Sequence, residues 1–209
     1  MEIDSKGYFQ EVANQWDTLR QDFFNEEVRD KAYEVAKVKE GELAADIGAG
    51  TGFITEGLLK KGLKVIAVDR SQEMLEQMKQ KFSSFEVVEY RQGEAECLPI
   101  EDGAVDYTMA NMYLHHVEDP LVAIKEMARV IKSGGKLVIT DLDEHKFEFL
   151  KTEHHDRWMG FDRKDIEDWF LKAGLKNVVV DCVGGNCCAT SSCGCEKADI
   201  SIFIAYGEK

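Results

Sequence analysis

The sequence is short of proline and of positive charge. Only two prolines occur among 209 residues, of which 44% are hydrophobic, and this composition favours a folded chain over disorder. Lysine and arginine together number 26 against 40 aspartates and glutamates, so the formal charge is −14 at pH 7. Because proteins that bind the phosphate backbone carry a basic face, this charge argues against DNA, RNA and anionic membrane surfaces as partners.

The chain also lacks the features of a targeting signal. Its first residues carry neither the basic nor the apolar region of a secretory signal, and no apolar run approaches the ~20 residues that span a bilayer. We therefore expect a soluble, cytoplasmic protein, either a monomer or a homodimer. The length predicts a single domain, with a helical cap over residues 1–40 and a core over residues 41–209.

Hydrophobic periodicity predicts helices first and then an alternation of strands and helices. Apolar residues recur at three- and four-residue spacing between Phe9 and Phe23, and Asn25 can cap a second helix. Seven short apolar runs predict strands at residues 43–47, 63–69, 85–90, 105–110, 136–141, 176–183 and 199–206. The expected fold class is α/β: a Rossmann-like, mainly parallel seven-stranded sheet with helices on both faces. Residues 184–198 would join its last two strands in an antiparallel hairpin.

A glycine-rich turn follows the first predicted strand, where residues 46–52 read Asp-Ile-Gly-Ala-Gly-Thr-Gly. Glycines there let the backbone approach a ligand that a Cβ would block. The next predicted strand ends about twenty residues later in Asp69, whose carboxylate can accept both hydroxyls of a ribose. Together these features predict a site for an adenosine-type cofactor.

The spacing of the glycines indicates which cofactor it is. The dinucleotide pattern is G-x-G-x-x-G, with a pyrophosphate at the helix N-terminus, whereas the pattern here is G-x-G-x-G, with Asp46 two residues before the first glycine. An acid at that position would repel a phosphate, which argues against a nicotinamide-dependent oxidoreductase. It suits the cationic amino-acid end of S-adenosylmethionine.

The order of these motifs resembles the class I S-adenosylmethionine-dependent methyltransferases, in particular the small-molecule group that includes quinone C-methyltransferases and arsenite methyltransferases. Segments 9–17, 93–99, 106–117 and 129–137 add to the resemblance, which covers most of the chain. It implies S-adenosylmethionine as cofactor and a small-molecule methyl acceptor. The cofactor-binding residues that it implies are Tyr8, Trp16, Asp46, Gly48, Ala49, Gly50, Gly52, Asp69, Arg70, Met74, Glu94, Ala95 and Asn111.

Two histidines follow the fourth predicted strand, where the resemblance places the reacting methyl group. His115 or His116 could act as a catalytic base at neutral pH, or the pair could cap the next helix and bond to its neighbours. Residues 153–161, which include Asp156 and Trp158, follow the fifth strand. They could line the substrate pocket or serve as ordinary packing and solvated surface.

Five of the six cysteines fall within fourteen positions, in an expected loop over residues 182–195. The predicted thiol ligands are Cys182, Cys187, Cys188, Cys193 and Cys195. They could hold a thiophilic acceptor such as trivalent arsenic, bind structural Zn²⁺ or an iron–sulfur cluster, or form a redox switch. Arsenite methyltransferases carry paired cysteines near the N-terminus, and this chain has none before Cys97. The alternative function is a non-catalytic metal-binding or sensing protein on a methyltransferase scaffold.

Overall fold

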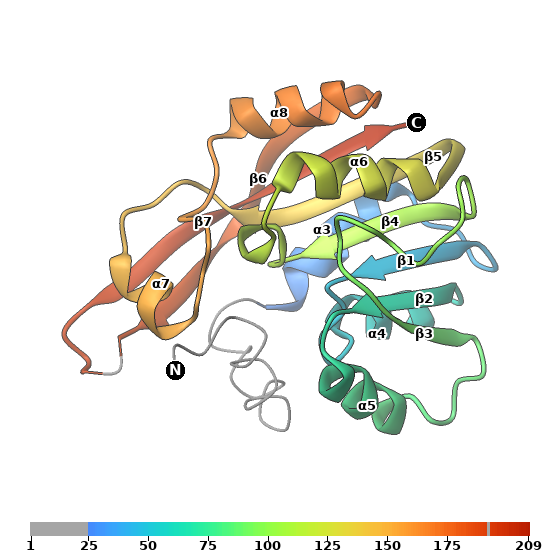
Figure 1. The fold of residues 1–209 in the computed structure, drawn as a ribbon, viewed down its shortest axis with the longest axis horizontal. Helices are drawn as coiled ribbons and strands as arrows, with labels where there is room; N and C mark the ends of the chain where they lie inside the picture. The colour runs from blue at the N-terminus through green and yellow to red at the C-terminus, as the bar shows by residue number, and fades with distance from the viewer. Residues whose placement is uncertain (1–24, 192) are drawn as a thin grey trace.

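A single seven-stranded sheet forms the centre of the fold (Figure 1). The structure is a computed structural model that describes residues 25–191 and 193–209. The strand order is β3-β2-β1-β4-β5-β7-β6. Strands β1 to β5 pair in parallel, and β7 pairs antiparallel with both β5 and β6, so β6 runs in the same direction as β1. The expected fold class is confirmed. The strands are β1 Leu43–Ile47, β2 Lys64–Asp69, β3 Val88–Gln92, β4 Val105–Asn111, β5 Ile131–Leu142, β6 Lys176–Thr190 and β7 Lys197–Glu208.

Helices cover both faces of this sheet. They are α3 Glu26–Ala36, α4 Phe53–Lys60, α5 Gln72–Lys81, α6 Pro120–Val130, α7 Glu148–Glu153 and α8 Arg163–Lys172, with a short 3-10 helix, η2 Leu114–His116. Because successive strand residues point to opposite faces, Ala44 packs in the cluster that contains α3 and α4, and Ala45 packs in the cluster that contains α6 and α8. The central strands are therefore apolar on both faces, as the sequence pattern predicted.

Asparagine and aspartate side chains cap three of the helices, and Asn25 is the cap predicted from the sequence. Asn25 Oδ1 accepts from Glu27 N at 3.0 Å, at the start of α3. Asp119 and Asp162 accept from backbone N–H groups in the first turns of α6 and α8. Each cap satisfies an N–H group that the helix itself leaves without a partner.

Three predicted strand boundaries were wrong. Strand β5 begins at Ile131 and not at residue 136. Strand β3 begins at Val88 and not at residue 85, since the chain turns after α5 and leaves Phe85 and Val87 exposed. The final hairpin is also longer than expected. Backbone pairing resumes after a bulge between Cys182 and Asn186, and this pairing extends β6 to Thr190. Figure 1 shows the paired β6 and β7 reaching past the end of β4, beside α7.

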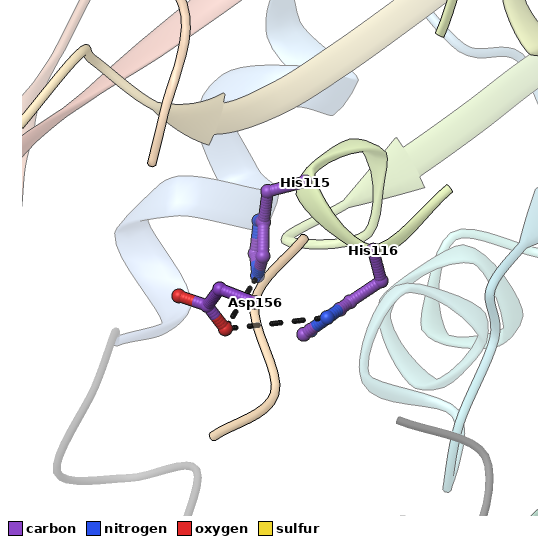
Figure 2. A group of neighbouring side chains, drawn as sticks. All are labelled: His115, His116 and Asp156. Atoms are coloured by element: carbon purple, nitrogen blue, oxygen red, sulfur yellow. Dashed lines mark ion pairs between the residues drawn. The ribbon is translucent and has the colours of Figure 1, made fainter. Parts of the chain in front are cut away.

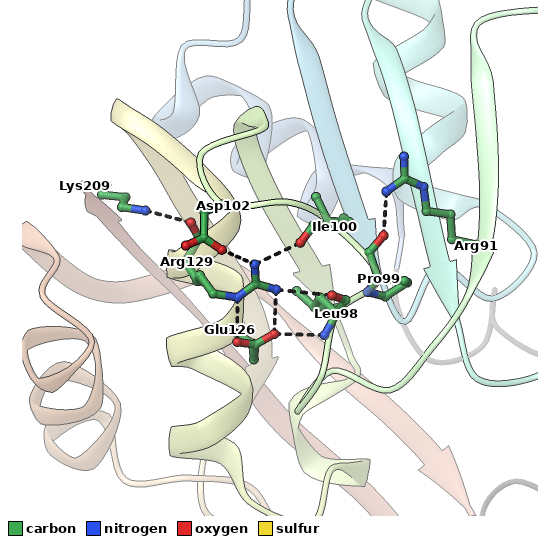
Figure 3. Close-up of polar contacts among 8 residues, drawn as sticks. All are labelled: Arg91, Leu98, Pro99, Ile100, Asp102, Glu126, Arg129 and Lys209. Carbon is green, nitrogen blue, oxygen red and sulfur yellow. Dashed lines mark hydrogen bonds and ion pairs between the residues drawn. The ribbon is translucent and has the colours of Figure 1, made fainter.

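Arg129 fastens the segment that connects β3 to β4 onto α6 (Figure 3). Its guanidinium donates to the carbonyl oxygens of Ile100 at 2.9 Å and Leu98 at 3.2 Å. It also pairs with Glu126 and Asp102. These bonds hold the buried Leu98 and Ile100 against the sheet.

The predicted first helix, with Tyr8 and Trp16, lies outside the described residues. Within residues 25–191 and 193–209, no helix is both long enough and apolar enough to cross a membrane.

Candidate active site

A pocket lies where β1, β2 and β4 end, between neighbouring parallel strands. At β1 the strand order reverses direction, and open α/β sheets bind ligands at such a point. The residues that line the pocket are Asp46, Gly48, Ala49, Gly50, Thr51, Phe53, Ile54, Asp69, Arg70, Ser71, Met74, Asn111, Met112, Tyr113 and His116.

The glycine-rich turn forms one wall of this pocket. Gly48 has a φ of +67°, and a Cβ on it would overlap the ring of Tyr113. Gly52 has a φ of +90° and precedes α4, where a Cβ would overlap the ring of Phe82. Both the positive φ and the close packing require glycine, so the turn keeps its backbone exposed to whatever fills the pocket.

Asp69 ends β2 and connects that strand to the glycine-rich turn. One carboxylate oxygen accepts from Gly50 N and the other accepts from Ser71 N, each at 2.8 Å. Burial raises the pKa of Asp69, and the two N–H groups oppose that rise. Each oxygen retains a lone pair, so the carboxylate can accept two further hydrogen bonds from a ligand.

Asp46 is a second buried acid in the same wall, with 2% of its surface exposed. Its Oδ2 accepts from Thr55 N at 3.0 Å and from Thr55 Oγ1 at 2.7 Å, which ties the end of β1 to α4. Burial raises the pKa of Asp46 to about 7, although the bonds from Thr55 act in the opposite direction. A cation in the pocket would relieve this cost of burial.

Most of the predicted cofactor residues meet in this one pocket. Asp46, Gly48, Ala49, Gly50, Asp69, Arg70, Met74 and Asn111 line it directly. Gly52 lies just behind the turn, and Glu94 lines a neighbouring hollow that also contains Arg70, Tyr113 and His116. Ala95 is only 1% exposed and packs in the core beside Leu98.

Six lining residues were not predicted from the sequence. They are Thr51, Phe53, Ile54, Ser71, Met112 and Tyr113. Thr51, Met112 and Tyr113 lie inside motif segments already singled out, and the other three lie within two residues of a predicted motif or strand end. Proximity to the motifs was therefore the available signal. Tyr113 is the most notable, because its ring packs against Gly48 and separates the pocket from the neighbouring hollow that it also lines.

The two predicted catalytic histidines occupy different positions in η2. His116 lines the pocket, whereas His115 lies behind it and bonds through Nδ1 to Asp141 Oδ1 at 2.6 Å. Burial lowers the pKa of His115, but Asp141 and Asp156 outweigh this effect and raise it to about 9. Burial and the neighbouring His115 place the pKa of His116 well below its usual value.

Asp156 completes this group from the segment after α7. Its Oδ1 lies 3.8 Å from His115 Nε2 and 4.0 Å from His116 Nδ1 (Figure 2). The backbone N–H groups of Arg157 and Trp158 both donate to the His115 carbonyl at 3.0 Å, and these bonds hold the segment in place. Asp156 thus lies beside the two histidines, while Trp158 packs against Phe161 as the packing alternative expected.

The predicted cysteine site is not assembled in the described residues. Cys182, Cys187 and Cys188 belong to strand β6, so the expected loop over residues 182–195 was too long, and the true connection spans residues 191–196. Cys187 is buried and Cys188 is exposed, because adjacent strand residues point to opposite faces. Cys193 and Cys195 form a disulfide. Within the described ranges, the group of three or more side chains that could hold a metal is His115, His116 and Asp156.

Comparison with known proteins gives a consistent family. A family model described as a methyltransferase domain matches residues 45–139. The chain is 32% identical over 167 residues to 2-methyl-6-phytyl-1,4-hydroquinone methyltransferase of Arabidopsis thaliana. The aligned region covers 77% of this chain and 48% of the relative. It is 36% identical over 142 residues to demethylmenaquinone methyltransferase of Staphylococcus aureus, covering 65% of this chain and 59% of that protein. The chain thus spans about half the length of these curated relatives.

Solved structures share the fold at lower sequence identity. Phosphoethanolamine N-methyltransferase 2 of Haemonchus contortus, in complex with S-adenosylhomocysteine, superposes with a TM-score of 0.80 at 16% identity, covering 100% of this chain and 60% of that chain. A SAM-dependent methyltransferase from Aquifex aeolicus gives a TM-score of 0.67 at 20% identity, covering 99% and 98%. These similarities support the Rossmann-like architecture.

Proposed function

We propose that this protein, which belongs to the class I S-adenosylmethionine-dependent methyltransferases, binds S-adenosylmethionine in the pocket at the end of β1 and transfers its methyl group to a small-molecule acceptor. The observation that carries the proposal is the pairing of Asp69 with the glycine-rich turn. That pairing places a two-oxygen acceptor beside exposed backbone, at the point where the sheet changes direction.

The donor and acceptor groups of the pocket fit the cofactor. Asp69 can accept both ribose hydroxyls, and Met74 offers an apolar surface to a base. Gly48 has to be glycine, because its φ is positive and the ring of Tyr113 fills the space that a Cβ would take. Asp46 supplies a buried negative charge of the kind that an ammonium group would neutralise.

When bound, the cofactor supplies a methyl group on a positively charged sulfur. The residues of this chain contribute mainly orientation and exclusion of water, because methyl transfer depends on holding the acceptor close and aligned. Asn111 ends β4 inside the pocket, and its Oδ1 accepts from Thr140 Oγ1 at 2.8 Å, which fixes its amide. His116 lines the same pocket as Asn111, so we retain the predicted catalytic role for His116.

We take the first candidate acceptors from the named relatives, which act on a hydroquinone and on demethylmenaquinone. A soft metal or metalloid held by thiols was the other acceptor class considered from the sequence. It requires several thiolates at one point, whereas Cys187 and Cys188 point to opposite faces of β6. A quinol-type acceptor is therefore the better supported candidate.

Calorimetric titration of S-adenosylmethionine into the purified protein tests the cofactor site. We expect saturable binding that Asp69→Ala weakens by at least tenfold, since the substitution removes about two hydrogen bonds to a charged group. Asp168→Ala is the matched control, because Asp168 is an exposed carboxylate on α8 that pairs with Lys172, away from the pocket. Absence of binding by the wild type, or equal weakening by both variants, would contradict the proposal.

The acceptor is tested with a panel assayed for S-adenosylhomocysteine release. The panel contains demethylated quinols, small thiols and arsenite, each with the wild type and with Cys187→Ser/Cys188→Ser. We expect turnover of a quinol-type acceptor that is unchanged in the cysteine variant. If the wild type methylates arsenite alone and the cysteine variant does not, the acceptor is a metalloid held by thiols and not a quinol. Binding of the cofactor with no turnover of any compound would favour a sensing protein on this scaffold.

A further inference from the structure

The group formed by His115, His116 and Asp156 has the composition and spacing of a metal site. Two imidazoles and one carboxylate are a common ligand set for Zn²⁺ and related divalent transition metals. The three candidate ligand atoms lie within 4.8 Å of one another, and all three residues are buried. We propose that His115, His116 and Asp156 bind one divalent transition-metal ion of the Zn²⁺ type beside the cofactor pocket.

The separations of the ligand atoms support this assignment. Two ligands bound about 2.1 Å from one ion lie at most about 4.2 Å apart. Asp156 Oδ1 lies within this limit of both His115 Nε2, at 3.8 Å, and His116 Nδ1, at 4.0 Å, and all three ligand atoms lie within 4.8 Å of one another. Small movements of the side chains would bring all three onto one ion. Both histidines project from η2 and the aspartate from the facing segment, so the three side chains surround a common point (Figure 2).

Asp141 supplies the support that metal-binding histidines usually have. His115 Nδ1 bonds to Asp141 Oδ1 at 2.6 Å, which leaves Nε2 as the nitrogen that faces Asp156. A carboxylate on the other ring nitrogen orients a histidine ligand and raises its basicity. Asp141 is itself held, because its Oδ2 accepts from Leu114 N at 2.8 Å.

The charge of the group also favours a cation. Asp141 and Asp156 are 0% and 5% exposed; His115 lies between them, and His116 also lies beside Asp156. Buried carboxylates need opposite charge close by, which a divalent cation between Asp156 and the two imidazoles would supply. Any proton that the ion displaces from a ligating nitrogen leaves to solvent.

Three protein ligands leave a coordination position open, as in catalytic zinc sites. His116 lines both the cofactor pocket and the neighbouring hollow, so that position would face the space where an acceptor enters. An oxygen or sulfur atom of an acceptor bound there would lose its proton more readily. In this arrangement both histidines act on the acceptor through the ion. This use of the site rests on the proposed methyl-transfer function, whereas the metal site itself does not.

Metal binding is measured on the full chain, freed of metal with a chelator and kept under a thiol reductant. We expect Zn²⁺ titration to show one tightly bound ion per chain, and His116→Ala and Asp156→Asn each to weaken it by at least a hundredfold. Asp141→Asn, which touches only His115 and the backbone, should weaken it by roughly 10- to 100-fold. Cys182→Ser and Cys188→Ser are the matched controls and should leave the affinity unchanged.

Cobalt provides a test that does not depend on whether the variants fold. Co²⁺ bound to the wild type should show visible d–d absorption without the intense near-ultraviolet band of a cobalt–thiolate bond. A thiolate band, loss of the ion in the cysteine variants only, or no tight ion in the wild type would each overturn the assignment. Titrating S-adenosylmethionine into the metal-free protein separates the two proposals, because Asp46 and Asp69 are not among the metal ligands.

Discussion

Asp46→Asn should stabilise the protein at neutral and alkaline pH while weakening cofactor binding. Asp46 is buried, and its pKa of about 7 compares with an ordinary value of 3.8. By linkage this difference corresponds to about 4 kcal/mol, which is the cost of ionising the acid inside the folded protein. Asparagine keeps an oxygen that can accept from Thr55 and never ionises, so the substitution removes this cost.

The sign of the pH dependence follows from which state holds the proton. Between about pH 4 and pH 7 the folded protein keeps a proton on Asp46 that the unfolded chain has lost, so the wild-type free energy of unfolding falls as pH rises through this window. We expect Asp46→Asn and the wild type to be similar near pH 4 and to diverge by up to about 4 kcal/mol by pH 8. Other titrating groups are common to both proteins and cancel in the difference.

Urea unfolding at a series of pH values between 4 and 8 measures the divergence, and calorimetry on the same proteins measures cofactor affinity. Asp106→Asn is the control with the opposite sign, because Lys132 and Leu43 N hold the pKa of Asp106 below its ordinary value against the effect of burial. That variant should lose stability relative to the wild type as pH rises past the ordinary pKa of 3.8, and its curve should run parallel to the wild type above about pH 5. Parallel unfolding curves for Asp46→Asn and wild type at every pH would refute the reasoning.

Two further substitutions test the packing around the site. Gly48→Ala should lower the free energy of unfolding by about 1–3 kcal/mol and abolish cofactor binding, because the position combines a φ of +67° with contact to Tyr113. Gly185→Ala has open space around it and should change neither property in thermal melts and calorimetry. Arg129→Met should cost about 2–4 kcal/mol in urea unfolding, since it strips Leu98 O, Ile100 O and Glu126 of their partner. Lys60→Met breaks the pair between the exposed Lys60 and Glu56 on α4 and should stay within about 0.5 kcal/mol of the wild type. An equal loss of stability in the Arg129 and Lys60 variants would contradict the role given to Arg129.

The parallel core of the fold could be predicted because its signals are local. Strand β1 and the turn after it are adjacent in sequence, and Asn25, Asp119 and Asp162 cap the helices that they directly precede. The pairing of Asp69 with the turn was also predictable, because a βαβ unit brings the ends of neighbouring strands together. Cofactor chemistry therefore followed from a pattern about twenty residues long.

The length of the last hairpin was not predictable in the same way. Its second half, residues 186–190, pairs with residues 197–201 only because a bulge after Cys182 restores the register. Gly184 and Gly185 were interpreted as the beginning of a loop, since glycine usually marks a turn. Strand continuation was decided by backbone pairing with β7, which no single segment of sequence encodes.

Sequence alone determined the Rossmann-like order of elements and the glycine-rich turn with its acid, and thereby the resemblance to methyltransferases, because these depend on short-range periodicity and spacing. It also singled out His115 and His116 as a pair. Only the tertiary structure decided that the two differ, with Asp141 from β5 behind one of them and Asp156 from the segment after α7 between both. Those acids lie tens of residues away in sequence and meet the histidines through packing of the sheet, so their charge and geometry emerge only in the folded chain.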